Sequence, residues 1–156
     1  MRRALGIPVA LAVLLWTGVA WSGDALSERA AAIERASMEP DGTRVVVGHI
    51  SRKLAISVET LRAQRAQTEF GWGDLLIAHR LAKVTGRTFE QIAAESRSGK
   101  TWEEIARVHD VDSAKLVADL QQSLDAIEKR SEDRPPNRET LFGPGKKNSN
   151  VGRQHY

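Results

Sequence analysis

Apolar residues recur at spacings of three and four along most of this 156-residue chain, which is the pattern of amphipathic helices. Between residues 44 and 130 there is no proline, and the one β-branched run, Val45-Val46-Val47, reads better as a helix start than as a strand. The pattern predicts an all-α protein, an array of short amphipathic helices. We expect these helices near residues 44–55, 58–67, 72–84, 89–97, 102–109 and 113–130.

A further helix is predicted ahead of this array, between residues 24 and 39, and Pro40-Asp41-Gly42 then marks a turn. One side of this first helix carries Leu26, Ala30, Ile33 and Ser37. The expected apolar stripe of the last helix consists of Ala114, Val117, Leu120, Leu124 and Ile127.

Helix ends are marked by capping residues. Thr88 with Gln91, and Thr101 with Glu104, have the capping-box spacing that satisfies free amide donors at a helix start. Glycines mark two expected helix ends, and hydroxyl or carboxyl side chains mark two further starts. These positions are Gly86, Gly99, Ser57 and either Ser113 or Asp112.

Two pairs of segments match when the chain is shifted by about 30 residues, 57–61 with 88–92 and 70–75 with 100–105. Trp72 and Trp102 occupy matching positions, and we expect both in the core because large apolar residues at such positions are usually buried. Three histidines fall at the same interval: His49, His79 and His109. The pattern predicts repeats of about 30 residues that share a core, with coincidence between short helices as the alternative.

The first residues resemble a secretory signal. Arg2 and Arg3 precede an uncharged stretch that ends in small residues, which favours a signal peptide over residues 1–25. The expected cleavage region is Ser22, Gly23, Asp24 and Ala25. An uncleaved segment anchored in the inner membrane is the alternative, because about 20 apolar residues can just span a bilayer.

The rest of the chain then divides into an N-terminal helix and turn (26–40), a helical domain (44–130) and a disordered basic tail (131–156). Residues 24–133 hold 16 Lys and Arg against 19 Asp and Glu, a net charge of −3, whereas residues 134–156 carry +4. The high pI therefore comes from the chain ends. The absence of cysteine excludes disulfides and thiolate metal sites.

Residues 104–116 have the spacing of a helix-turn-helix, with Asp110 where a turn glycine is usual. A helix that enters a DNA groove needs net positive charge, but the expected second helix has mixed charge. We therefore interpret this spacing as structural packing.

No residue set predicts a catalytic, metal or cofactor site, so we expect a protein that is not an enzyme. The three histidines are expected at half-exposed helix positions, since no zinc-site spacing accompanies them. Gly71-Trp72-Gly73-Asp74 lacks the strand and the Lys-Ser/Thr pair of a phosphate loop, so its glycines are expected to permit a tight joint before a helix. Glu103 and Glu104 are explained by their place in the first turn of a helix.

Two blocks carry a family resemblance: residues 71–78, of the form Gly-x-Gly-acid-Leu-x-Ile-Ala, and residues 99–106, of the form Gly-Lys-x-Trp-x-x-Ile-Ala. In these blocks the chain resembles a group of small exported bacterial helical proteins. The resemblance covers about residues 45–112. It implies a setting in the bacterial envelope and assigns no catalytic residue.

Together these features favour a periplasmic or secreted helical protein that binds a protein or peptide in the cell envelope and uses no cofactor. The basic tail is expected to touch anionic surfaces, as polybasic segments do, and nucleic acid is not an expected partner. The alternative is a cytoplasmic helix-turn-helix DNA-binding regulator, if the signal is not used. A cell-wall hydrolase would need a convergent acidic pair with one raised pKa.

Overall fold

The computed structural model describes residues 24–133, and the chain in this range is all helical, as predicted. Residues 1–23 and 134–156 lie outside the described part, and with them most of the expected signal and tail. The helices are α1 (Ala25–Met38), α2 (Gly42–Leu54), α3 (Val58–Thr68), α4 (Trp72–Thr85), α5 (Phe89–Arg97), α6 (Trp102–Val108) and α7 (Ser113–Glu132).

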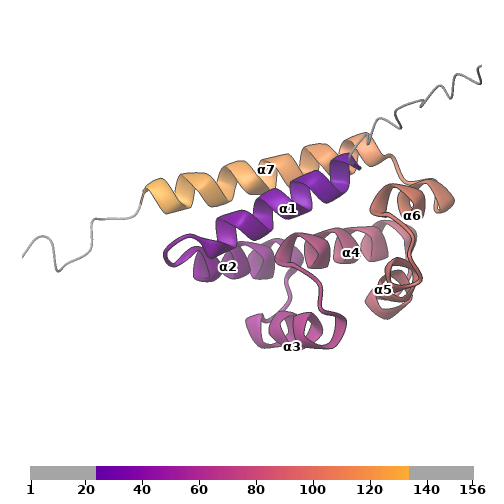
Figure 1. Ribbon diagram of the computed structural model, residues 1–156, viewed down its shortest axis with the longest axis horizontal. Coiled ribbons are helices and arrows are strands. Elements are labelled where there is room, and N and C mark those ends of the chain that lie inside the picture. Colours follow the sequence, from indigo (N-terminus) through magenta and orange to yellow (C-terminus); the bar gives the residue numbers. More distant parts are fainter. Residues whose placement is uncertain (1–23, 134–156) are drawn as a thin grey trace, which may run out of the picture.

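Helices α1 and α7 lie side by side and run in the same direction, although they come from opposite ends of the described chain (Figure 1). Helices α2 and α4 pack beneath them, and the short helices α5 and α6 close one end of the molecule (Figure 1). α3 contacts only α2 and α4 closely and contributes a single fully buried residue, Leu61. The core is one continuous apolar cluster to which all seven helices contribute.

Local sequence signals set the helix starts. Thr88 and Thr101 form the two predicted capping boxes, and the Ser57 hydroxyl accepts a hydrogen bond from the backbone of Thr60. Asp112, rather than Ser113, caps α7 by accepting from two backbone amides. The β-branched run at 45–47 lies inside α2, so the helical interpretation of that run is confirmed.

Two details of α7 differ from expectation. Ala114 is exposed although it was placed in the apolar stripe, and Leu116 is buried in its stead. The helix also runs to Glu132, past residue 131, where the tail was expected to begin. The buried stripe consists of Leu116, Leu120, Leu124 and Ile127, which recur at spacings of three and four, and the last three of them were predicted.

The closest helix crossing in the core is that of α1 and α4. Gly73 lies in the first turn of α4, where a Cβ would overlap the backbone of Ala30 in α1. A glycine is therefore needed here for a close approach of two helices. This differs from the tight joint expected for both glycines of the block, a role that Gly71 alone fills as the residue preceding α4.

Both tryptophans of the described chain are buried, with 2% of Trp72 and 4% of Trp102 exposed, as predicted. Each is the first residue of its helix, so its side chain closes the core at a helix start. Between residues 24 and 133 no helix is both long and apolar enough to cross a membrane.

Candidate functional site

The expected cleavage region is only partly described, because Ser22 and Gly23 lie outside the described residues. Asp24 caps α1 by accepting hydrogen bonds from the backbone amides of Leu26 and Ser27. The amide of Ala25 donates to Glu103 Oε1 at 3.1 Å, which ties the start of α1 to α6. The downstream half of the expected region is therefore part of the folded domain.

The three histidines occupy half-buried helix positions and do not converge. His79 Nε2 is 2.8 Å from Gln64 Oε1, and His109 Nε2 is 2.8 Å from Glu95 Oε1. The Nε2 of His49 is buried without a hydrogen-bond partner. Over the range 24–133 no group of three or more His, Asp or Glu side chains is placed to hold a metal ion.

Burial lowers the pKa of His79 below its ordinary value, and the carboxylate of Glu90 offsets this only in part. Burial also lowers the pKa of His49, together with the positive charges of Lys53 and Arg130 and against the opposing charge of Asp119. Both imidazoles are therefore held toward the neutral form. A neutral, buried imidazole is a source of pH-dependent stability.

The helix-turn-helix spacing corresponds to α6, its turn and α7. Asp110 has a φ of 53°, so it adopts the left-handed conformation that a turn glycine usually supplies. The second helix of the pair, α7, packs along α1 and α2 and uses Asp119 to hold Lys53 and Arg80 at 2.9 and 3.0 Å. These contacts give α7 a structural role at the centre of the fold.

A polar network centred on Glu34 connects α1, α3 and α4. Glu34 Oε1 accepts from the Arg65 guanidinium at 2.7 Å, and Oε2 accepts from the backbone amide of Trp72 at 2.7 Å. The Arg65 guanidinium also lies 4.7 Å from the centre of the Trp72 ring, in cation–π contact. Arg65 further donates from Nε to the backbone carbonyl of Phe70 at 3.3 Å.

Asp74 extends this network to α6. One carboxylate oxygen accepts from the amide of Gly71 at 3.1 Å, and the other accepts from Trp102 Nε1 at 2.8 Å. The ring of Trp102 also meets Phe70 edge-on, with 5.5 Å between the centroids. The residues Glu34, Arg65, Trp72, Asp74 and Trp102, which we call the Glu34 network, thus hold four helices in register.

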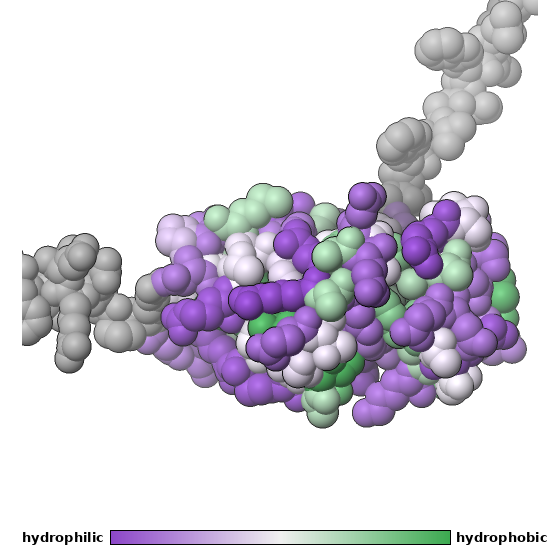
Figure 2. Space-filling model, turned by 90° about the horizontal axis from the view of Figure 1, so that it is seen from below, coloured by the Kyte–Doolittle hydropathy of each residue, from purple (hydrophilic) through white to green (hydrophobic). Residues whose placement is uncertain are grey.

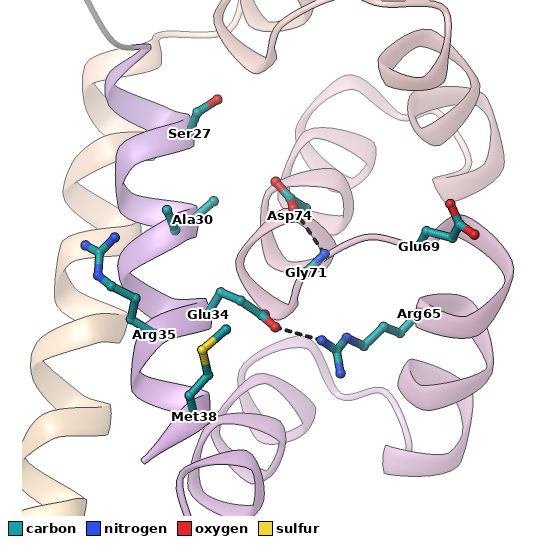
Figure 3. A pocket seen from close by; sticks show the side chains of 10 residues that line it. Ser27, Ala30, Glu34, Arg35, Met38, Arg65, Glu69, Gly71 and Asp74 are labelled. Atoms are coloured by element: carbon teal, nitrogen blue, oxygen red, sulfur yellow. Dashed lines mark hydrogen bonds and ion pairs between the residues drawn. The ribbon is translucent and has the colours of Figure 1, made fainter.

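A groove of about 520 Å³ lies beside the network, between α1, α3 and the start of α4 (Figure 3). Glu34 reaches across it from α1 toward Arg65 of α3, and Met38 projects from the last turn of α1 at its edge (Figure 3). Met38 is 74% exposed, the largest value among the exposed large apolar residues of the described chain. We call this hollow the Glu34 groove.

Two further hollows adjoin the Glu34 groove around α3, and Arg65 lines all three. The face seen from below is mainly hydrophilic, with small hydrophobic patches separated by polar residues (Figure 2). Because α3 buries so little, the surface around it is indented and chemically mixed. Such a surface offers both apolar contact and charged groups to a bound chain.

The charged groups at the floor of the Glu34 groove are already engaged. Both carboxylate oxygens of Glu34 and both of Asp74 accept hydrogen bonds from the protein. A general acid needs a carboxyl group whose pKa is raised. Burial tends to raise the pKa of Glu95, but hydrogen bonds from His109 and Lys100 outweigh it and lower that pKa. Hydrogen bonds from Thr101 lower the pKa of Glu104.

A scan against protein-family models finds no match to this chain. A search of curated proteins and a search of solved structures likewise find no significant match. The groove and its network are therefore interpreted on their own geometry.

Sequence analysis found Trp72, Asp74 and Trp102 through the two tryptophan blocks but missed Glu34 and Arg65. Glu34 is 31 residues from Arg65 and 38 from Trp72, so no local spacing relates them. Nothing in the sequence sets these two residues apart from the other charged residues of their helices.

Proposed function

We propose that this chain is an exported, non-enzymatic helical protein that binds a protein or peptide segment in the cell envelope at the Glu34 groove. The observation that carries the proposal is a groove whose charged floor is internally satisfied while its rim is exposed. Engaged carboxylates are poorly suited to proton transfer, whereas an indented mixed surface with an exposed methionine is suited to contact with another chain.

The export half of the proposal rests on the first residues of the sequence. Arg2 and Arg3 followed by an uncharged stretch have the composition of a secretory signal. Asp24 supports a boundary just before it, because removal of Asp24 would cost α1 its cap and its hydrogen bond from Glu103. An N-terminal cap contributes about 1 kcal/mol to stability.

The basic residues near the C-terminus supply a second contact in this proposal. Lys146, Lys147 and Arg153 give residues 143–156 a positive charge without any acidic residue. Near an anionic surface each such charge contributes about 1 kcal/mol. They would hold the protein at an anionic polymer or lipid headgroup while the groove binds its partner.

The groove is tested by a photo-crosslinking residue placed at Met38 in the full chain in intact cells. We expect one discrete crosslinked protein or peptide from this position. The matched control carries the same residue at Val108, which is 59% exposed at the end of α6. Capture that depends on position 38, and that falls when the exposed Ala31, which lines this groove, is changed to Glu, supports the groove as the binding surface.

Equal capture from positions 38 and 108 would contradict binding at the Glu34 groove.

The compartment is tested separately by fractionation and N-terminal sequencing. We expect the N-terminus of the mature chain to lie within the expected cleavage region, and the protein to be recovered in the envelope fraction. An untrimmed chain with Met1, found in the cytosol and bound to DNA, would favour the DNA-binding regulator instead.

A further inference from the structure

A second groove, distinct from the Glu34 groove, lies on the face shared by α1, α2 and α7. Its volume is about 510 Å³. Its floor is apolar, formed by the residues Ala32, Ala36, Val45, Leu124 and Ile127. Charged side chains stand around it, namely Arg35 and Glu39 on α1 and Glu128 on α7. We call it the α1–α7 groove.

The groove opens next to the point where the described chain ends. Ser131 lines it in the last turn of α7, and Asp133 follows as the C-cap of that helix. From Leu124 to Ser131 the helix rises by about 10 Å, which is the length of groove that α7 borders. Any chain that continues from Asp133 therefore starts at the mouth of this groove.

The 23 residues beyond Asp133 contain one pair of adjacent large apolar side chains, Leu141 and Phe142. Apart from this pair, the segment consists mainly of proline, glycine, polar and basic residues. Leu141 is eight positions after Asp133, and an extended chain covers about 3.3 Å per position, or about 26 Å in all. That reach exceeds the length of the groove, even after the chain has reversed direction.

Charged residues of both signs precede the apolar pair and stand on the rim. Arg138 and Glu139 precede Leu141 and Phe142, and the rim offers both acidic and basic groups: Glu39, Glu128 and Arg35. A segment tethered this close has an effective concentration on the order of millimolar. A contact with a dissociation constant of about 1 mM is then occupied about half of the time.

We propose that Leu141 and Phe142 dock into the α1–α7 groove and cover its apolar floor. The docked segment is a strap over the seam between the first and last helices. Gly143 and Pro144 follow directly, so the strap ends there, and Lys146, Lys147 and Arg153 lie beyond it. The strap and the surface-binding basic residues are thus separate parts of one C-terminal segment.

The absence of cysteine allows a direct test on the full chain. The variant Glu39→Cys/Thr140→Cys places one thiol on the groove rim and one just before the apolar pair. The control adds Leu141→Ser/Phe142→Ser to the same two cysteine substitutions, so that the tether length and the thiol positions are unchanged. We expect the intramolecular disulfide to form about tenfold faster in the rim variant than in the control.

Equal rates in the rim variant and the control would overturn the proposal. Disulfide-linked dimers of the rim variant, formed in preference to the intramolecular bond, would assign the groove to a second copy and also overturn it. Crosslinking at Met38 tests a different surface, so either proposal can fail without the other.

Methyl NMR provides an independent reading on the unmodified cysteine-free background. In the full chain, Leu141→Ser/Phe142→Ser is expected to shift the methyl signals of Val45 and Ile127, which line the groove, and to leave those of Leu61 unchanged. Unchanged signals at Val45 and Ile127 would contradict docking.

Discussion

The helix pairs α3–α4 and α5–α6 have similar structures and differ where they contact α1. Each pair begins at a hydroxyl cap, Ser57 or Thr88, and each joint has one residue of positive φ, Glu69 at 61° or Gly99 at 97°. Each second helix then starts with a buried tryptophan. The duplication predicted from the sequence stays a prediction, with matched joints as geometric support.

A matching histidine contact spans each pair. His79 bonds to Gln64 within α3–α4, and His109 bonds to Glu95 between α5 and the end of α6, both at 2.8 Å. The acceptor is neutral in the first pair and a carboxylate in the second. In the first pair His79 also stacks on Phe89, with the centroids 4.4 Å apart. The two histidine hydrogen bonds thus have the same length, although the one in α3–α4 lies in a more apolar environment and the one in α5–α6 in a more charged environment.

The two pairs differ most where α1 crosses them. One residue after each tryptophan, the α4 position is Gly73, pressed against the backbone of Ala30, and the α6 position is Glu103, exposed and bonded to the start of α1. The middle of α1 demands a residue without a side chain, whereas its first turn admits a long one. Contact with α1, rather than the structure shared by the two helix pairs, therefore decides which residue can follow the tryptophan.

The largest expected effect is that of Gly73→Ala. We expect a loss of about 3 kcal/mol in the free energy of unfolding, because the new Cβ would overlap the backbone of Ala30 and force α1 away from α4. Urea denaturation followed by circular dichroism measures it. The control is Gly48→Ala in the middle of α2, where a Cβ meets only the Arg52 side chain, and there we expect a gain of up to about 1 kcal/mol. Equal effects at both sites would refute the close crossing.

The contributions of the two tryptophans to stability are distinguished by replacing each with phenylalanine. Both changes remove the same volume and an indole N–H group, but only the Trp102 N–H group donates a hydrogen bond, to Asp74. The Nε1 of Trp72 has no such partner among the described residues. We expect Trp102→Phe to cost about 1 kcal/mol more than Trp72→Phe in the free energy of unfolding. Chemical denaturation of the two variants, compared at one pH, decides this, and an equal cost would argue against the Trp102–Asp74 bond.

The joints are compared through their residues of positive φ. Gly99→Ala is expected to cost about 1 kcal/mol, because a side chain is strained in the left-handed region. Glu69→Gly at the matching joint is expected to change stability in the opposite direction by about 0.5–1 kcal/mol. Thermal melting of both variants measures the shifts. A destabilised Glu69→Gly protein would show that the Glu69 side chain contributes more than its backbone strain costs.

The smallest expected effect is a difference in pH dependence between the pairs. Because the pKa of His79 is lowered in the folded protein, the unfolded chain binds a proton first on acidification. Stability is therefore highest above the ordinary histidine pKa of about 6.5 and falls as the pH drops below it. His79→Gln is expected to flatten that decline between pH 7 and pH 5.

Glu95 responds in a lower window. Its lowered pKa contributes stability above the ordinary glutamate pKa of about 4.3, and this contribution is lost as the pH falls through the folded value. Glu95→Gln is thus expected to change the unfolding profile mainly below pH 5. A variant that flattened the decline in the histidine window instead would contradict the separation of the two pairs.

The fold could be predicted from the sequence because its signals are local. Thr88, Thr101 and Ser57 cap helices through residues three positions away, so the chain itself indicates where each helix starts. The Glu34 groove could not be predicted, since Glu34 on α1 and Arg65 on α3 meet only when both helices pack against α4. Gly73 was singled out as a glycine, but its partner Ala30 lies in a helix distant in sequence, so its role as a crossing point has no local signal.

The parallel pairing of α1 with α7 has a consequence for a chain that emerges from a ribosome or a membrane pore one residue at a time. Ala32 and Ala36 appear early, but the side chains that border them, Leu124 and Ile127, come last. Folding must wait for this late arrival, because contacts between residues far apart in sequence form slowly. A nascent chain can pack α1 on α2 and α4, but the side of α1 that faces α7 stays uncovered until synthesis ends, which gives a chaperone both the time and the surface to bind it.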